Sequence, residues 1–209
     1  MTGIHKELAF EEGICAHLAA HGWLYEPGAA ARYDRAHALF SEDLLAWVRA
    51  TQPEAWQSLD KTHGPAAATL LADRLRTALD RQGTLALLRD GLDVVGLRQR
   101  LALCQFRPAL GMNEALQSRY AANRLRVVRQ LRYSLHGEDC LDLVLFLNGI
   151  PVATTELKSD YTQSVGDAID QYRYDRPPRV PGRNLPQPLL RFPGGALVHF
   201  AVSNSRVAM

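Results

Sequence analysis

The sequence predicts an α/β fold in which helices dominate the first half of the chain and strands the second. Apolar residues recur at helical spacing through much of the first hundred residues. From about residue 101, runs rich in apolar and β-branched residues replace that pattern. Two such runs, residues 141–147 and 150–158, flank the pair Asn148-Gly149, which is a strong signal for a tight β-hairpin.

The helical half begins with an amphipathic helix over residues 1–21. Leu8, Ile14 and Leu18 mark its apolar stripe, and Gly22 ends the pattern. Ser41 is expected to be the N-cap of the second helix. The further helices are expected over residues 41–50, 64–82 and 84–90.

The second half alternates extended runs with two short helices. Residues 125–133 predict a strand with one arginine-bearing face. A later helix is expected to begin at a Ser164 cap and to end near residue 176, where Pro177-Pro178 stops it. The remaining expected elements are strands at 101–106 and 197–202 and a helical turn at 113–120.

The composition fits a soluble globular protein of one large domain, or of one domain with an appendage. The 209 residues are 47% hydrophobic and 22% charged. No apolar run approaches membrane-spanning length, no signal-peptide pattern opens the chain, and no P-loop is present, so neither a membrane nor nucleotide hydrolysis by that route is expected. Cys15, Cys104 and Cys140 lack metal-ligand spacing and suit reduced thiols in the cytoplasm.

The net charge of +2 does not itself indicate a nucleic-acid binder, but the arginines are clustered. One cluster precedes the hairpin and another follows it, as expected for a site that contacts phosphates. The alternative is that each cluster is a solvated helix face. The expected DNA contacts are Arg124, Arg126, Arg129, Arg173 and Arg176.

The hairpin carries ionisable residues inside otherwise apolar strands. Asp142 lies near the start of the first strand, and Glu156 and Lys158 close the second. Buried strands rarely hold such residues unless they pair with each other or bind a metal. Mg²⁺ takes oxygen ligands, and Asp142, Glu156 and the backbone carbonyl of Leu157 offer three. Lys158 projects from the same strand face as Glu156, where an ammonium can orient water or stabilise phosphate charge.

The hairpin turn decides whether Asp142 can join Glu156. An unbulged two-residue turn would place Asp142 opposite Thr155, on the wrong face. We therefore predict a three-residue loop with Gly149 left-handed, or another bulge, so that Asp142, Glu156 and Lys158 share a face. The alternative is that Asp142 caps a turn and that Glu156 and Lys158 form a plain ion pair.

This hairpin resembles the Asp…Glu-x-Lys core of the PD-(D/E)xK nuclease superfamily. The wider sequence resembles the N-terminal domain of the restriction (R) subunit of type I restriction-modification enzymes. The resemblance covers residues 101–209 well and the first helix more loosely. Four runs carry it: Phe-Arg-Pro-Ala-Leu-Gly-Met-Asn at 106–113, Arg-Tyr-Ala-Ala-Asn-Arg at 119–124, the strand and turn at 141–149, and Asp-Ala-Ile-Asp-Gln-Tyr-Arg-Tyr-Asp-Arg at 167–176.

The resemblance implies a restriction-endonuclease-like core, a mixed sheet flanked by helices with an inserted helical segment. It implies a single nuclease domain over residues 1–209, with a first core helix at 1–25, the insertion at 35–95 and the sheet core at 100–209. It also implies a fragment of a longer chain, whose ATP-driven DNA translocase lies elsewhere. Double-stranded DNA would be the substrate, with modification and specificity subunits as partners.

The resemblance also assigns residues. Asp142 and Glu156 would be Mg²⁺ ligands and Lys158 the catalytic lysine, while Gln171 would match the Gln of a Gln-x-x-x-Tyr motif. The chain departs from that motif, because Asp175 follows at the tyrosine position. A first-helix glutamate near the metal would be Glu11, with Glu7 as the alternative.

Two other functions remain open from the sequence. The domain can be a non-catalytic docking module that links a DNA translocase to its partner subunits. It can also be a nuclease of the same fold that acts in DNA repair. The four motif residues of the expected site favour catalysis over docking, and the 119–124 and 171–176 runs favour restriction over repair, by resemblance.

Overall fold

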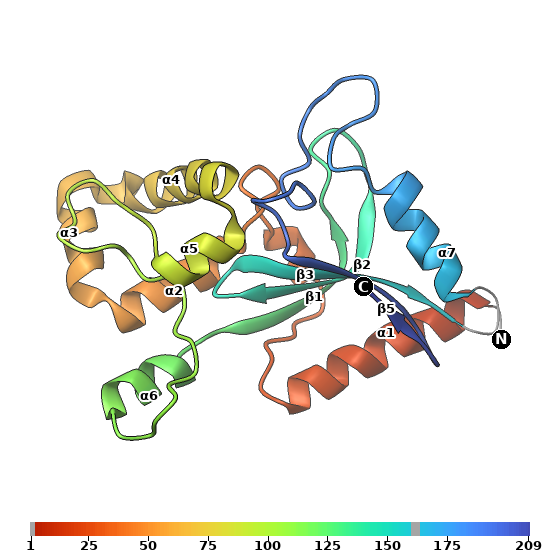
Figure 1. The fold of residues 1–209 in the computed structure, drawn as a ribbon, viewed down its shortest axis with the longest axis horizontal. Coiled ribbons are helices and arrows are strands. Elements are labelled where there is room, and N and C mark those ends of the chain that lie inside the picture. Colours follow the sequence, from red (N-terminus) through yellow and green to blue (C-terminus); the bar gives the residue numbers. More distant parts are fainter. Residues whose placement is uncertain (1–2, 160–163) are drawn as a thin grey trace.

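The computed structural model describes residues 3–159 and 164–209, with side chains from Leu8 onward (Figure 1). A five-stranded mixed sheet forms its centre, with the strands in sequence order. Neighbouring strands are antiparallel except for the parallel pair of β3 and β4. This is the mixed sheet of the predicted α/β fold. The strands are β1 (Leu125–Arg132), β2 (Cys140–Leu147), β3 (Ile150–Lys158), β4 (Val198–Ser203) and β5 (Val207–Ala208).

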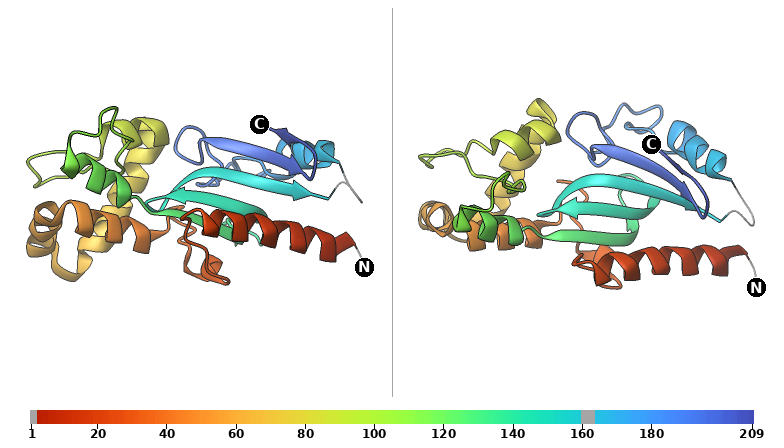
Figure 2. Two further views of the ribbon diagram at one scale, coloured as in Figure 1. Left: turned by 90° about the horizontal axis from the view of Figure 1, so that it is seen from below. Right: turned by 60° about the horizontal axis from the view of Figure 1, so that its bottom comes forward.

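Two helical segments lie on opposite faces of this sheet (Figure 2). Helix α1 (Gly3–Ala20) packs Cys15 into an apolar cluster with Val127, Leu143 and Leu157 from three strands. Helix α7 (Val165–Asp170) contacts β3 and β4 and continues as a π-helical turn, η3 (Gln171–Asp175). The sheet is thus covered on both sides where the hairpin strands carry their acids.

A separate helical group packs at the other end of the hairpin (Figure 1). Its interior is apolar, and Trp47, Leu75 and Leu79 are fully buried there. Ile150, next to the hairpin turn, belongs to the same cluster. The group consists of α2 (Ser41–Thr51), α3 (Pro53–His63), η2 (Gly64–Ala66), α4 (Ala67–Gln82) and α5 (Thr84–Asp90); η1 (Ala29–Arg32) precedes it and α6 (Glu114–Ala121) follows it.

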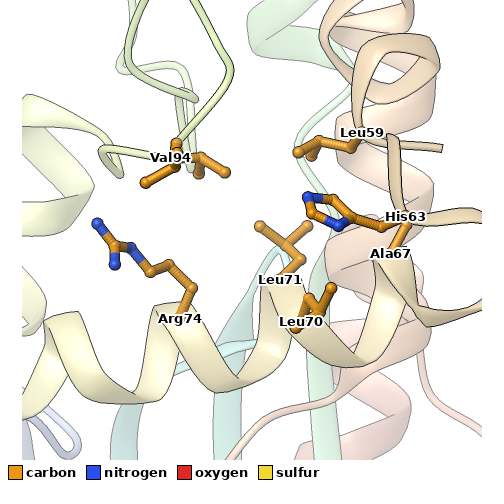
Figure 3. Close-up of a pocket in the computed structure, with 8 residues that line it drawn as sticks. Leu59, His63, Ala67, Leu70, Leu71, Arg74 and Val94 are labelled. Atoms are coloured by element: carbon orange, nitrogen blue, oxygen red, sulfur yellow. The ribbon is translucent and has the colours of Figure 1, made fainter. Parts of the chain in front are cut away.

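The helical group also contains a mostly apolar pocket, of about 160 Å³, between α3 and α4 (Figure 3). Leu59, Leu71 and Val94 line it, with His63 and Arg74 as its polar residues. None of the residues expected at the hairpin site borders it. The pocket is therefore separate from the chemistry that the sequence predicts.

Two expectations for individual elements are wrong. Residues 101–106 form no strand; Leu101 makes only an isolated bridge to Leu92. Leu103 is buried, and Ala102 N donates to the Gln52 side chain, so the apolar pattern there reflects burial against helices rather than strand pairing. Ser41 is the first helical residue rather than the N-cap, which is Phe40.

Helix α3 and strand β5 were not expected from the sequence. Helix α3 begins at Pro53, whose fixed φ and missing N–H suit a first helical position. Strand β5 has two residues, too short for an alternating pattern to show. Within the described residues, no helix is both long enough and apolar enough to span a bilayer.

Candidate active site

A two-residue turn closes the hairpin that carries the acids. Leu147 pairs directly with Ile150, and Asn148 and Gly149 have φ of 49° and 80°. Two central residues with positive φ make a type I′ turn, so the expected three-residue loop is wrong. Asn148 tolerates this conformation because its buried side chain is anchored: Oδ1 accepts from Arg124 N at 2.7 Å and Nδ2 donates to Leu103 O at 3.0 Å.

A bulge elsewhere in the hairpin restores the shared face. Leu145 pairs with Ala153, but the next pair is Phe146 with Pro151, so Val152 is an extra residue on β3. Beyond the bulge, Leu143 pairs with Thr155. Continuing that register sets Asp142 opposite Glu156. The alternative form of the prediction, a bulge away from the turn, is confirmed.

At Asp142 it is the side chain, rather than the backbone, that bonds to β3. Its Oδ2 accepts a hydrogen bond from the backbone N–H of Leu157 at 2.7 Å. Its other oxygen lies 3.3 Å from the donating Nε2 of Gln130. Asp142 thus lies between the two neighbouring strands of the sheet rather than capping a turn.

Glu156 is the most deeply buried acid of this hairpin, with 1% of its surface exposed. Burial and the neighbouring Asp142 carboxylate raise its pKa to about 8, although Arg176 opposes the shift. Arg176 Nε donates to Glu156 Oε1 at 2.7 Å. The ion pair of Glu156 is therefore with Arg176, and the alternative pairing with Lys158 is absent from the described contacts.

Lys158 lies two residues beyond Glu156 and shares its strand face. It is 9% exposed. The described part of the chain supplies no ion-pair partner for its ammonium. After the hydrogen bonds from Ser164, its charge helps to lower the pKa of Asp167 in α7, and it is not among the influences on the pKa of Glu156.

Glu11 of α1 is part of the same group of acids. It is buried, and it accepts from Arg129 Nε at 3.1 Å and from Gln130 Nε2 at 2.8 Å. Burial, followed by the charge of Asp142, raises its pKa. Glu11 therefore lies where the preferred first-helix glutamate was expected; the side chain of Glu7 lies outside the described residues.

Gln130 joins these acids and was missed from the sequence. Its Nε2 donates both to Glu11 and to Asp142. Its φ is 48°, and it has no partner in the otherwise regular pairing of β1 with β2. The sequence shows only an ordinary strand position there, so nothing in the alternating pattern marks it.

The π-helical turn η3 brings Tyr172 against β3. Tyr172 Oη and His199 Nδ1 both hydrogen-bond to Thr154 Oγ1, at 2.8 and 2.7 Å. Thr154 is two residues before Glu156, so this network fixes α7 beside the acids. The Oε1 atom of Gln171 is buried and accepts no hydrogen bond within the described residues. Asp175, at the motif's tyrosine position, is exposed.

Most of the arginines expected to contact DNA are bound to carboxylates instead. Arg126 is buried against Asp43, which is fully buried and also binds Arg124 at 2.8 Å. Arg129 pairs with Glu11 and Glu12, and Arg176 with Glu156. Arg173 alone of the five is largely exposed, 3.9 Å from Asp170.

The donor set fits a hard divalent cation. Asp142 and Glu156 supply carboxylates from neighbouring strands, and Leu157, next to Glu156, supplies a backbone carbonyl. Gln171 Oε1 is a buried acceptor to which no described group donates. Mg²⁺ suits such a set, because it usually keeps several waters and takes one or two carboxylates. No three His, Cys, Asp or Glu side chains of the described chain converge as a complete cage.

Comparison with protein-family models matches residues 12–207 to the type I restriction enzyme R protein N terminus. No curated protein and no solved structure matches the chain. The matched range covers β1 to β4, the first residue of β5, all of α7 and the second half of α1. The chain therefore belongs to the family of type I restriction enzyme R protein N-terminal domains.

Proposed function

We propose that this domain is a Mg²⁺-dependent endonuclease that cleaves phosphodiester bonds of double-stranded DNA within a type I restriction enzyme. The observation that carries the proposal is the juxtaposition of half-buried Asp142 and buried Glu156, with Lys158 on the same face as Glu156. Burial and the charge of Asp142 together raise the pKa of Glu156 to about 8, so a cation bound here would be stabilised by both carboxylates. The family assignment supplies the restriction context.

Asp142, Glu156 and the carbonyl of Leu157 would hold the ion, with Glu11 at the margin. When bound, Mg²⁺ supplies a more acidic water and stabilises charge on the phosphate. Lys158 would orient that water or neutralise a phosphate oxygen. Gln171 Oε1 would accept a hydrogen bond from a bound water. Burial of Glu156 and Lys158 strengthens these interactions, because the local dielectric is lower than that of water.

The partners follow from the same proposal. Double-stranded DNA is the substrate, and ATP acts in a translocase region of the R subunit rather than at this site. Modification and specificity subunits complete the complex, which would act in the cytoplasm. Recognition by another subunit suits a domain whose arginines are largely bound to its own acids.

The test is calorimetric titration of Mn²⁺ into this chain and into Asp142→Asn. Asparagine keeps an acceptor for Leu157 N, so the variant removes charge with little change of contacts. Asp139→Asn, an exposed acid in the β1–β2 loop, is the matched control. We expect Mn²⁺ binding to be lost only in Asp142→Asn. In the complete R-subunit complex, the same substitution should abolish DNA cleavage. Binding in none of the three proteins, with no cleavage defect in the complex, would favour the docking module.

A further inference from the structure

Arg176 contacts both of the strands that carry the acids. Its Nε donates to Glu156 Oε1 at 2.7 Å, and its Nη2 donates to the carbonyl of Cys140 at 3.0 Å. Cys140 is two residues before Asp142 on β2, and Glu156 is on β3. The guanidinium therefore joins the ends of both acid-bearing strands, where a cation shared by Asp142 and Glu156 would lie.

The backbone holds Arg176 in this position. Its N–H donates to Gln171 O at 2.9 Å, closing the π-helical turn that also presents Gln171. π-Helical turns insert an extra residue and are frequent at functional sites. Pro177 and Pro178 follow directly, so the turn also marks the point where the helix ends. Arg176 is thus placed by the same local structure as a candidate site residue.

The charges indicate that Arg176 and a divalent cation compete. Asp142 and Glu156 carry at most two negative charges, and the nearby Glu11 is already paired with Arg129. A divalent cation bound beside Arg176 would bring the positive charge next to these two carboxylates to three. Glu156 Oε1 accepts the hydrogen bond from Arg176, and the same oxygen binds a metal less strongly while it holds that bond. Release of Arg176 resolves the excess charge.

We propose that Arg176 is a positioning residue that acts as a tethered counter-ion, occupying the cation's place at Glu156 until the metal displaces it. The inference rests on the proposed function and deepens it, because it concerns the same carboxylates. It also gives Arg176 a role different from the DNA contact expected from its sequence cluster. The hydrogen bond from Arg176 keeps Glu156 oriented in the metal-free protein, and metal binding replaces this contact.

The experiment compares Mn²⁺ affinity and thermal unfolding in this chain and in Arg176→Gln and Arg176→Lys. Arg173→Gln is the matched control, because Arg173 lies on the same helical segment but is largely exposed. Its one ion pair within the described residues, with Asp170, is long, at 3.9 Å. We expect Arg176→Gln to bind Mn²⁺ about tenfold more tightly, since a charge-assisted contact no longer opposes the metal. Arg176→Lys should lie between it and the parent, and Arg173→Gln should match the parent.

Thermal unfolding separates exchange from a purely structural ion pair. With exchange, Arg176→Gln unfolds at a lower temperature without metal but gains more from saturating Mn²⁺ than the parent does. Unchanged or weaker Mn²⁺ affinity in both Arg176 variants, with Asp142→Asn still abolishing binding, would overturn the counter-ion role alone. If Arg176→Gln fails to fold, the affinity of Arg176→Lys decides in the same way. Absence of binding in every protein would instead sink the metal site itself.

Discussion

Gln130 bridges Glu11 of the first helix and Asp142 of β2 through a single amide nitrogen, at 2.8 and 3.3 Å. The two acids come from elements that are more than a hundred residues apart, and burial, the larger cause, together with the charge of Asp142 raises the pKa of Glu11. An amide between two carboxylates reduces their repulsion by donating to both, so Gln130 holds α1 in place over the hairpin site.

Replacement of Gln130 by alanine should loosen this group of acids without removing any of them. We expect Mn²⁺ affinity to fall about tenfold, the lower end of what outer contacts of metal ligands contribute. The measurement is calorimetry on Gln130→Ala, with Gln57→Ala on the exposed face of α3 as control. Equal affinity in the two variants would show that Glu11 and Gln130 take no part in metal binding.

Glu156 makes stability depend on pH. Its folded-state pKa of about 8 lies above the ordinary value of 4.5, so between these pH values the folded protein holds a proton that the unfolded chain has released. Its contribution is fully present below pH 4.5 and is lost as pH rises through 8. The free energy of unfolding should fall by up to about 1.4 kcal/mol per pH unit in that window.

Denaturant unfolding at several pH values between 5 and 8.5 measures this slope, with Glu156→Gln as the comparison. Glutamine cannot titrate, so the variant should show a flatter dependence. The raised pKa of Glu11 leaves part of the slope in place. Parallel curves for the two proteins would mean that Glu156 does not retain its proton in the folded state.

Arg126 should matter for stability rather than for DNA binding. Its guanidinium is buried, donates to Asp43 at 2.5 Å and lies 4.3 Å from the centre of the Phe40 ring. Arg126→Met leaves the buried Asp43 with Arg124 alone. We expect a loss of about 3–5 kcal/mol in the free energy of unfolding, typical of breaking a buried ion pair.

The control is Arg132→Met on the same strand, where the arginine is exposed and pairs with the exposed Glu138. That change should cost at most about 1 kcal/mol. Chemical denaturation of both variants provides the measurement. A cost below that of Arg132→Met would reassign Arg126 to another role, including the phosphate contact expected from its sequence cluster.

Local patterns in the sequence predict most strands and several helices, because the spacing of apolar residues follows the buried face of each element. Strands around residues 125–133 and 150–158 and the helix at 84–90 follow such patterns closely. Residues 101–106 show where the inference fails: Leu101 and Leu103 are buried against helices, and the apolar signal does not say what covers them.

The sequence likewise predicts some residues of the candidate site and not others. Asp142, Glu156 and Lys158 are visible as acids and an amine in apolar strands, and the structure brings Glu11 to them. Gln130 and the ion pairs of the arginines depend on contacts between distant elements, which spacing along the chain does not encode. Electrostatic clustering in sequence therefore suggested DNA contacts at positions that the fold uses largely for internal pairing.

Gly149 joins the hairpin to the helical group and should tolerate no side chain. Its φ is 80°, and a Cβ there would lie 2.3 Å from the backbone oxygen of Phe40. Its own carbonyl accepts from Phe40 N at 2.8 Å. Gly149→Ala therefore combines left-handed strain with a backbone clash, and we expect a loss of about 2–4 kcal/mol in the free energy of unfolding.

Gly182→Ala separates the two effects, because its φ is 73° but no atom lies within 4 Å of the added Cβ. That control should lose only about 1–2 kcal/mol from strain. Chemical denaturation compares the two variants at one pH. Equal losses would mean that the Phe40 backbone moves away at little cost, and that the hairpin tip is not rigidly fixed against α2. A larger loss in Gly149→Ala would establish that this contact sets the position of the hairpin, and with it the strands that carry Asp142 and Glu156.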